Sequence, residues 1–104
     1  MSEKPVAIVT GGSRGVGAAT AKMLSENGWN VLITCSSSLA EAEIVAKKCS
    51  SKIAEVVPLQ ADVAKDTDCK ATINMAVEKW GRIDALVNNA GTTKFAWDLS
   101  LIHI

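Results

Sequence analysis

Short apolar runs alternate with longer stretches of helical periodicity along the 104 residues of this chain. Four of the runs have the length of buried strands, and they cover about residues 5–10, 31–33, 56–59 and 84–88. The stretches between them space their apolar residues at i, i+3, i+4 and i+7, which is typical of amphipathic helices. Strands that alternate with helices predict βαβ units, and therefore an α/β fold with a parallel sheet of about four strands and three helices.

Each predicted helix carries an apolar stripe that we expect to be its core-facing side. The first stripe consists of Val16, Ala19, Thr20, Met23 and Leu24, and Gly28 ends that helix. The second consists of Ala42, Val45, Ala46 and Cys49, and the segment before it, Ser38-Leu39-Ala40-Glu41, has the form of a capping box. The third consists of Cys69, Ile73, Ala76, Val77 and Trp80, and Gly81 follows it.

Composition and charge limit the kinds of molecule that this chain is expected to bind. Hydrophobic residues make up 48% of the chain, which suits one globular domain, and 11 basic residues balance 11 acidic ones without any basic cluster. Nucleic acid and membrane partners are therefore not expected, and a small molecule fits better. No stretch resembles a signal peptide or a membrane span, which predicts a cytoplasmic protein. Cys35, Cys49 and Cys69 lack metal-ligand spacing, so we expect reduced thiols in packed elements.

A glycine-rich turn follows the first strand-like run. Thr10-Gly11-Gly12-Ser13-Arg14-Gly15-Val16-Gly17 lies between Val6-Ala7-Ile8-Val9 and the first helical stretch. A diphosphate needs backbone N–H groups aimed at it and no Cβ atoms in the way, and a helix N-terminus adds partial positive charge. The sequence therefore predicts a dinucleotide phosphate site at this turn, although a plain turn is the alternative for any single glycine.

Two further motifs accompany this turn. Asn88-Asn89-Ala90-Gly91 follows the apolar run Ala85-Leu86-Val87, and Asp62-Val63 follows the third strand-like run. In this order the three motifs resemble the short-chain dehydrogenase/reductase family, and most closely its 3-oxoacyl-[acyl-carrier-protein] reductase group. The resemblance implies the N-terminal half of a doubly wound Rossmann fold with strand order 3-2-1-4. Pro58 agrees with that order, because a proline cannot donate to a ladder and the third strand would be an edge.

The resemblance also implies which residues hold the cofactor. The cofactor-binding residues that it implies are Gly11, Gly12, Ser13, Arg14, Gly15, Val16, Ser36, Asp62, Val63, Asn89, Ala90 and Gly91. Asp62 would bind the adenine amino group with Val63 beside the ring, although a role for Asp62 in shaping a turn is the alternative. Gly17 is expected to let the helix pack closely, and Asn88 and Asn89 to tie neighbouring strands together. Asp84 is interpreted as a structural residue of a turn or strand start.

The end of the second strand indicates which cofactor is used. An acidic side chain there would bind the ribose hydroxyls of NAD and repel a 2′-phosphate. The segment reads Thr34-Cys35-Ser36-Ser37-Ser38, without a carboxylate, and Arg14 in the glycine turn supplies a cation. The sequence therefore favours NADP(H) over NAD(H), with a surface role for Arg14 and an ordinary polar loop as the alternatives.

The catalytic residues of the family have no counterpart here. The family uses a serine, a tyrosine and a lysine, and the chain contains no tyrosine, while Lys94 and Ser100 match none of the catalytic positions. We assign no catalytic residue and no metal site, and expect residues 1–98 to be a truncated, inactive NAD(P)-binding domain. The segment Leu99-Ser100-Leu101-Ile102-His103-Ile104 has the sequence expected from translation of a sequencing-adapter end, CTG-TCT-CTT-ATA-CAC-ATC. We therefore expect residues 99–104 to be an adapter-derived tail, with a natural short C-terminus as the alternative, and His103 is not offered as a base or ligand.

Two functional hypotheses remain open from the sequence. The first is the cofactor-binding portion of an NADP-dependent oxidoreductase that acts on a carbonyl or alcohol substrate, whose full-length parent forms a homodimer or homotetramer. The second is a nucleotide-binding half-domain without catalysis.

Overall fold

The computed structural model describes residues 4–11, 15–37, 39–51 and 53–89. Strands and helices alternate along this part of the chain, as the sequence pattern predicts. The strands are β1 (Val6–Thr10), β2 (Asn30–Cys35), β3 (Val56–Gln60) and β4 (Ala85–Asn88). The helices are α1 (Gly15–Glu26), α2 (Leu39–Cys49) and α3 (Asp66–Trp80).

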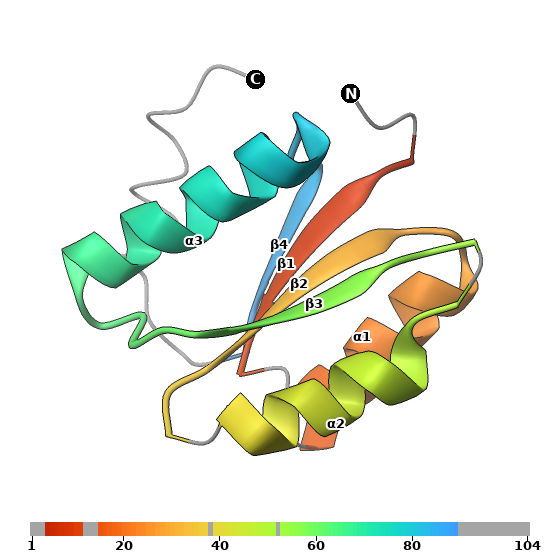
Figure 1. Ribbon diagram of the computed structural model, residues 1–104, viewed down its shortest axis with the longest axis horizontal. Helices are drawn as coiled ribbons and strands as arrows, with labels where there is room; N and C mark the ends of the chain where they lie inside the picture. The colour runs from red at the N-terminus through yellow and green to blue at the C-terminus, as the bar shows by residue number, and fades with distance from the viewer. Residues whose placement is uncertain (1–3, 12–14, 38, 52, 90–104) are drawn as a thin grey trace.

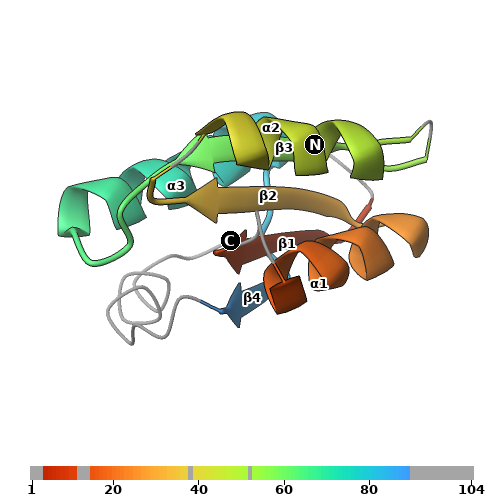
Figure 2. The same ribbon diagram turned by 90° about the horizontal axis from the view of Figure 1, so that it is seen from below.

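The four strands form one parallel sheet with the order β3-β2-β1-β4, which Figure 2 shows from below. This confirms the predicted fold class and strand order. Pro58 lies in β3, opposite Ile33 of β2, and β3 has no second neighbour in the described part of the sheet. An edge position is where a residue without an N–H donor costs no ladder hydrogen bond.

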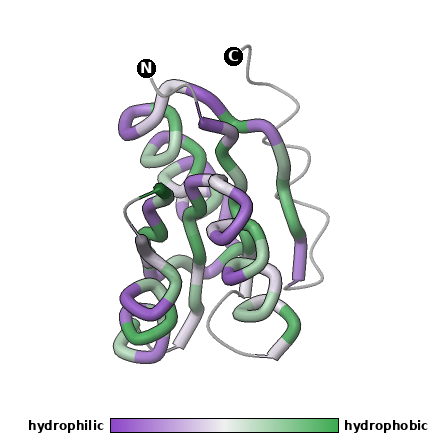
Figure 3. Tube along the Cα trace, turned by 90° about the vertical axis from the view of Figure 1, so that its right-hand side faces the viewer, coloured by the Kyte–Doolittle hydropathy of each residue, from purple (hydrophilic) through white to green (hydrophobic). Residues whose placement is uncertain are grey.

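Two hydrophobic layers cover the sheet, because successive side chains of each strand point to opposite faces. Figure 1 shows α3 on one face and α1 and α2 on the other. The layer under α3 joins Val6, Ile8 and Leu32 to Ile73 and Trp80. The layer under α1 and α2 has as its buried members Val9, Ala21, Val31, Ile33, Cys35, Ala42, Ala46 and Val56. Figure 3 shows the hydrophobic colour along the central strands, which are covered on both faces as in other parallel sheets.

The buried side of α1 differs from the predicted one. Its buried residues are Gly17, Ala21 and Ser25, whereas Val16 and Met23 are 72% and 58% exposed. Of the predicted stripe only Leu24 packs against the core. Small side chains on the buried side let α1 lie close to the sheet. Close packing therefore determines which side of α1 is buried, and the spacing of its larger apolar residues does not.

The stripes predicted for α2 and α3 are confirmed. Ala42 and Ala46 are buried, with Val45 and Cys49 packed beside them, and Cys69, Ile73, Ala76 and Trp80 are buried on α3. Gly81 ends α3 in the left-handed conformation, with φ of 75°, and its N–H donates to the Val77 carbonyl at 2.7 Å. α1 ends at Glu26, two residues before Gly28. Ser38 of the predicted capping box lies outside the described residues.

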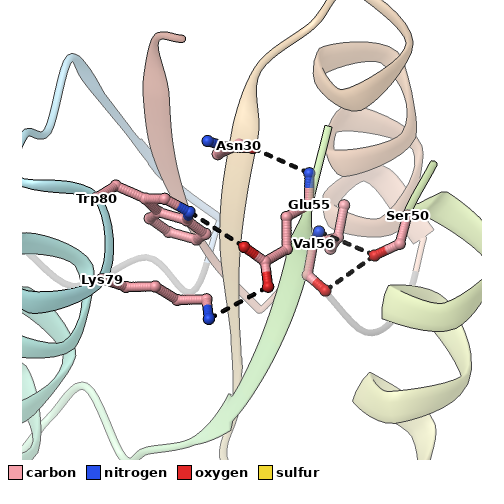
Figure 4. A network of polar contacts seen from close by, with 6 residues as sticks. All are labelled: Asn30, Ser50, Glu55, Val56, Lys79 and Trp80. Atoms are coloured by element: carbon pink, nitrogen blue, oxygen red, sulfur yellow. Dashed lines mark hydrogen bonds and ion pairs between the residues drawn. The ribbon is translucent and has the colours of Figure 1, made fainter. Parts of the chain in front are cut away.

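A polar network at the amino ends of β2 and β3 holds the last turn of α3 (Figure 4). The Trp80 indole N–H donates to Glu55 Oε1 at 3.3 Å, and Lys79 pairs with Glu55 Oε2 at 3.2 Å. The Glu55 backbone N–H donates to Asn30 Oδ1 at 2.9 Å. These contacts lie at the opposite end of the sheet from the glycine turn, and their role is to fix α3 on the sheet.

The three cysteines lie in three different elements, as expected for packed thiols. Cys35 of β2 and Cys69 of α3 are buried, and Cys49 is partly buried at the end of α2. Burial raises the pKa of the Cys49 thiol, and the positive charge of nearby Lys22 offsets only part of this increase. Within the described ranges, no helix has both the length and the apolar character that a membrane span requires.

Candidate functional site

The candidate site is the edge of the sheet at which the parallel strands have their carboxyl ends. Register places Thr10 beside Thr34 on one side and beside Asn88 on the other, and Cys35 beside Gln60. The residues that follow these four strands therefore meet at one edge. Ligands of open α/β sheets bind outside this edge, where the chain reverses the direction in which it adds strands. In this sheet that point lies between β1 and β4, because the chain adds β2 and β3 on one side of β1 and β4 on the other.

The two described glycines that flank residues 12–14, between β1 and α1, both have positive φ. Gly11 and Gly15 have φ of 68° and 53°, a region that L side chains rarely adopt. A Cβ at Gly15 would have no atom within 4 Å, so the surface above the start of α1 is open. A group of phosphate size can therefore approach the N–H groups of the first helical turn without meeting a side chain of Gly15.

The charges at the three helix N-termini differ. The first turn of α2 carries Glu41 and that of α3 carries Asp66 and Asp68, whereas the first turn of α1 carries no acidic residue. A carboxylate near a helix N-terminus neutralises the partial positive charge there. Among the three described helices, only α1 has an N-terminus whose partial positive charge is available to an external anion.

Gly17 marks the closest approach between α1 and the ends of the strands. A Cβ at this position would collide with the carbonyl of Gly11 and would lie 2.9 Å from Nδ2 of Asn89. The expectation that Gly17 permits close packing of the helix is therefore confirmed, and Gly11 and Gly17 lie directly against Asn89 after β4.

Side-chain hydrogen bonds tie the end of β4 to the end of β1. The Thr10 hydroxyl donates to Oδ1 of Asn88 at 3.1 Å, and Nδ2 of Asn89 donates to the Gly11 carbonyl at 3.3 Å. This confirms that Asn88 and Asn89 tie neighbouring strands. The role of Thr10 in joining β1 to β4 was not predicted from the sequence, although a hydroxyl beside the glycine turn indicates a possible hydrogen-bond donor. Its side chain is buried and so is fixed by these contacts.

The segment after β2 presents hydroxyl groups to solvent. Ser36 and Ser37 are exposed, directly beyond the buried Thr34 and Cys35. Neither exposed residue is acidic, so this stretch offers hydrogen-bond donors without a negative charge. A 2′-phosphate would meet donors and no repulsion at these two residues.

Asp62 and Val63 lie in the turn between β3 and α3. Oδ1 of Asp62 accepts the Ala64 backbone N–H at 3.0 Å, so the alternative role in shaping a turn is observed for that oxygen. The Val63 side chain is 9% exposed and packs in the layer under α3. An adenine ring at this turn would meet little of that side chain, because its apolar surface is already used by the core.

Asp84 lies at the opposite end of β4 and has the structural role expected of it. Its Oδ2 accepts the Val6 backbone N–H at 2.8 Å, and Arg82 binds both of its oxygens. The hydrogen bond from the Arg82 guanidinium, assisted by the Val6 N–H, lowers the pKa of the Asp84 carboxyl.

Several of the expected site residues lie outside the described ranges. They are Gly12, Ser13 and Arg14 of the glycine turn, Ala90 and Gly91 after β4, and the segment 99–104. The expected site residues that the structure describes all lie in the segments that follow the carboxyl ends of the four strands, and they are Gly11, Gly15, Val16, Ser36, Asp62, Val63 and Asn89. Among them, Asn89 contacts Gly11.

Comparison with known proteins identifies relatives across most of the chain. The model of the short chain dehydrogenase family matches residues 5–101. The chain is 39% identical over 94 residues to an uncharacterised oxidoreductase of Methylorubrum extorquens, covering 90% of this chain and 38% of that protein. It is 43% identical over 88 residues to the 3-oxoacyl-[acyl-carrier-protein] reductase FabG of Staphylococcus epidermidis, covering 85% of this chain and 36% of the reductase.

The structural comparison agrees with the sequence comparison. A crystal structure of a short-chain dehydrogenase/reductase from Burkholderia xenovorans superposes with a TM-score of 0.82 at 40% identity. The superposition covers 89% of this chain and 38% of the other, so the chain spans less than two fifths of the length of these relatives. The family match over residues 5–101 and the shared fold together show that this chain belongs to the short-chain dehydrogenase/reductase family.

Proposed function

We propose that this chain binds NADP(H) at the carboxyl edge of its sheet and is the cofactor-binding portion of an oxidoreductase. The observation that carries the proposal is the β1–α1 turn. It combines two glycines at positive φ, open space above Gly15 and a helix N-terminus without an acidic residue. These features suit the diphosphate of a dinucleotide, which needs close approach to backbone N–H groups.

The remaining parts of the cofactor would be distributed along the same edge. The exposed Ser36 would donate to the 2′-phosphate of NADP(H), together with Arg14 of the glycine turn. Asp62 would accept from the adenine amino group, and Asn89, Ala90 and Gly91 would lie along the ribose. The absence of an acidic residue at Ser36 and Ser37 is what supports NADP(H) over NAD(H).

The cofactor would supply hydride transfer at its nicotinamide, for the reduction of a carbonyl or the oxidation of an alcohol. The residues of this chain would bind and orient it, since the chain contains no tyrosine and we assign it no catalytic residue. The similarity to FabG of Staphylococcus epidermidis supports a carbonyl compound as the substrate of the parent enzyme. A cytoplasmic location and a homodimeric or homotetrameric parent complete the proposal.

The test is a fluorescence titration of the folded 104-residue chain with NADPH and with NADH. We expect NADPH to bind about tenfold more tightly, because one charge-assisted hydrogen bond to a phosphate contributes on that order. Ser36→Asp should abolish this preference by weakening NADPH binding, since it places a carboxylate beside the 2′-phosphate. Asn74→Asp, which adds the same charge on an exposed position of α3, is the matched control.

The outcomes separate the parts of the proposal. A folded chain that binds neither nucleotide contradicts the assignment of a cofactor site. A chain that binds NADH as tightly as NADPH contradicts only the choice of NADP(H). A preference for NADPH that Ser36→Asp leaves unchanged contradicts the role of Ser36. Nucleotide binding by this chain, together with a source gene whose reading frame stops after Ile104, would favour the half-domain hypothesis, whereas a frame that continues into a Tyr-x-x-x-Lys motif would contradict it.

A further inference from the structure

The turn that carries Asp62 is held by hydrogen bonds from three directions. The Ala61 N–H donates to the Cys35 carbonyl of β2 at 2.9 Å, which fixes the start of the turn to the sheet. Within the turn, the Lys65 N–H donates to the Asp62 carbonyl at 2.9 Å. From α3, the Asp68 carboxylate and the Cys69 thiol reach back to the turn.

Asp68 makes the contact closest to the candidate binding residue. Its Oδ2 accepts the backbone N–H of Asp62 at 2.8 Å. The N-cap residue Lys65 makes no side-chain cap hydrogen bond, and Asp68 stands three residues after it, where a capping box places the side chain that reaches backward. Here the Asp68 side chain reaches further, to the Asp62 N–H before the helix, and so ties the first turn of α3 to the turn of Asp62.

The Cys69 thiol adds a second link between the same two segments. It is fully buried and donates to the Val63 carbonyl at 3.1 Å. The two residues on either side of the Asp62–Val63 peptide bond are therefore each bound to neighbouring residues of α3. A turn fixed at consecutive residues has little freedom to rotate.

These contacts determine what the Asp62 carboxylate can do. Its Oδ1 accepts the Ala64 N–H at 3.0 Å, which fixes the plane of the carboxylate. Among the described residues Oδ2 has no hydrogen-bond partner, and the side chain is only partly buried. One oxygen of a fixed carboxylate is thus available to an external donor at the carboxyl edge of the sheet.

We propose that Asp68 is a positioning residue for nucleotide recognition: it holds the Asp62 backbone so that Oδ2 of Asp62 accepts the exocyclic amine of adenine. This rests on the proposed function, because it assumes that adenine lies at this turn. Asp68 itself does not touch the nucleotide. Its effect is therefore on discrimination for the amine and not on binding of the phosphates or the nicotinamide.

The experiment compares NADPH with its hypoxanthine analogue, deamino-NADPH, in which a carbonyl oxygen replaces the amine. We expect the wild-type chain to bind NADPH at least about fivefold more tightly than the analogue, as for the loss of one hydrogen bond to a charged acceptor. Asp68→Ala should bring this ratio close to one, whereas Asp68→Asn should keep most of it, because its amide oxygen can still accept the Asp62 N–H. A merely destabilising change would weaken both ligands equally and leave the ratio intact.

Asp66→Ala is the matched control, because it removes an equal charge from the same helical turn. It should leave the ratio at the wild-type value. Amide hydrogen exchange supplies a measurement that needs no variant, since the Asp62 N–H must be protected in the wild-type chain.

The outcomes that would overturn the inference differ from those that would overturn the proposed function. A wild-type chain that binds neither ligand contradicts the cofactor site itself. A chain that binds NADPH but not in preference to the analogue, or whose preference survives Asp68→Ala, contradicts the role of Asp68. Loss of the preference in Asp68→Asn, or an unprotected Asp62 amide, contradicts it too.

Discussion

Gly15 and Gly17 lie two residues apart at the start of α1 and require glycine for different reasons. Gly15 has φ of 53° with open space around its Cβ position, so a side chain there would strain the backbone without a collision. At Gly17 the obstacle is steric, because the Gly11 carbonyl and Asn89 occupy the place of a Cβ. Gly15 leaves room for a ligand, and Gly17 sets the distance between the helix and the strand ends.

Substitution of each glycine by alanine separates these two roles. Gly17→Ala should lower the free energy of unfolding by about 1–3 kcal/mol, as for other overpacked sites, because the nearest atom belongs to the backbone and cannot rotate away. Asn89→Ala should not restore stability to Gly17→Ala, since the carbonyl remains. Gly15→Ala should cost about 1–2 kcal/mol from its backbone conformation alone.

Urea unfolding followed by circular dichroism measures all four free energies. Restoration of stability in the double variant would show that Asn89, and not the Gly11 carbonyl, limits the approach.

Among the elements, α1 shows how a helix in a parallel α/β fold selects its buried side. The stripe Gly17-Ala21-Ser25 packs on the sheet, although the larger apolar residues of the helix lie elsewhere. The helix must begin at the glycine turn and then pass close over β1 and β2, so the side chains beneath it have to be small. Hydrophobic periodicity gives the correct face for α2, whose buried residues Ala42 and Ala46 are also small, and for α3, which buries Ile73 and Trp80.

A pair of substitutions on α1 tests this arrangement. Met23→Gln should change the free energy of unfolding by less than about 0.5 kcal/mol, because the side chain is 58% exposed. Ala21→Leu should cost about 1–3 kcal/mol, because a fully buried position has no room for the added carbons. Both are measured by urea unfolding. A larger loss for Met23→Gln than for Ala21→Leu would mean that the face indicated by periodicity is the buried one.

At the scale of the whole molecule, Asp84 links segments that are far apart in the sequence. It binds the N–H of Val6, 78 residues away, and so joins the first described strand to the last. Arg82 holds the carboxylate in place and lowers its pKa. A carboxyl whose pKa is lowered by folding stabilises the folded state above its unfolded pKa, and this contribution is lost as the pH falls through the folded pKa.

The stability of the chain should therefore depend on Asp84 in a way that varies with pH. Asp84→Asn should lower the free energy of unfolding at pH 7 and by a similar amount at pH 5, because the carboxyl is ionised at both. The difference between the variant and the wild type should shrink below about pH 4, the unfolded pKa of aspartate, as the native carboxyl is protonated. Urea unfolding across this range measures the difference directly.

Glu78→Gln is the control for the loss of one acidic charge on the exposed surface. Its effect should be small at every pH in the series. A constant difference between Asp84→Asn and the wild type down to pH 2 would show that the carboxylate charge contributes nothing at this position.

Much of the candidate site was predictable because its elements carry local signals. The glycine turn, Asn88, Asn89 and Asp62 each follow an apolar run, and parallel strands bring such residues to one edge of a sheet. Asp68 was not predicted as part of the site. An acid in the first turn of a helix is common, and only the path of the chain before α3 shows that it reaches Asp62. Likewise, the burial of Val63 depends on how α3 packs on the sheet.

The sequence by itself determined the order of elements, the parallel sheet with Pro58 at its edge, the C-terminal end of α3 and the family. These follow from the period of the apolar residues, from the geometry of proline and glycine, and from three motifs in a fixed order. Tertiary structure alone decided which side of α1 is buried, which oxygen of Asp62 is already used, and which residues hold its turn. Those features depend on distances between segments far apart in the chain, and no local pattern of residues encodes such distances.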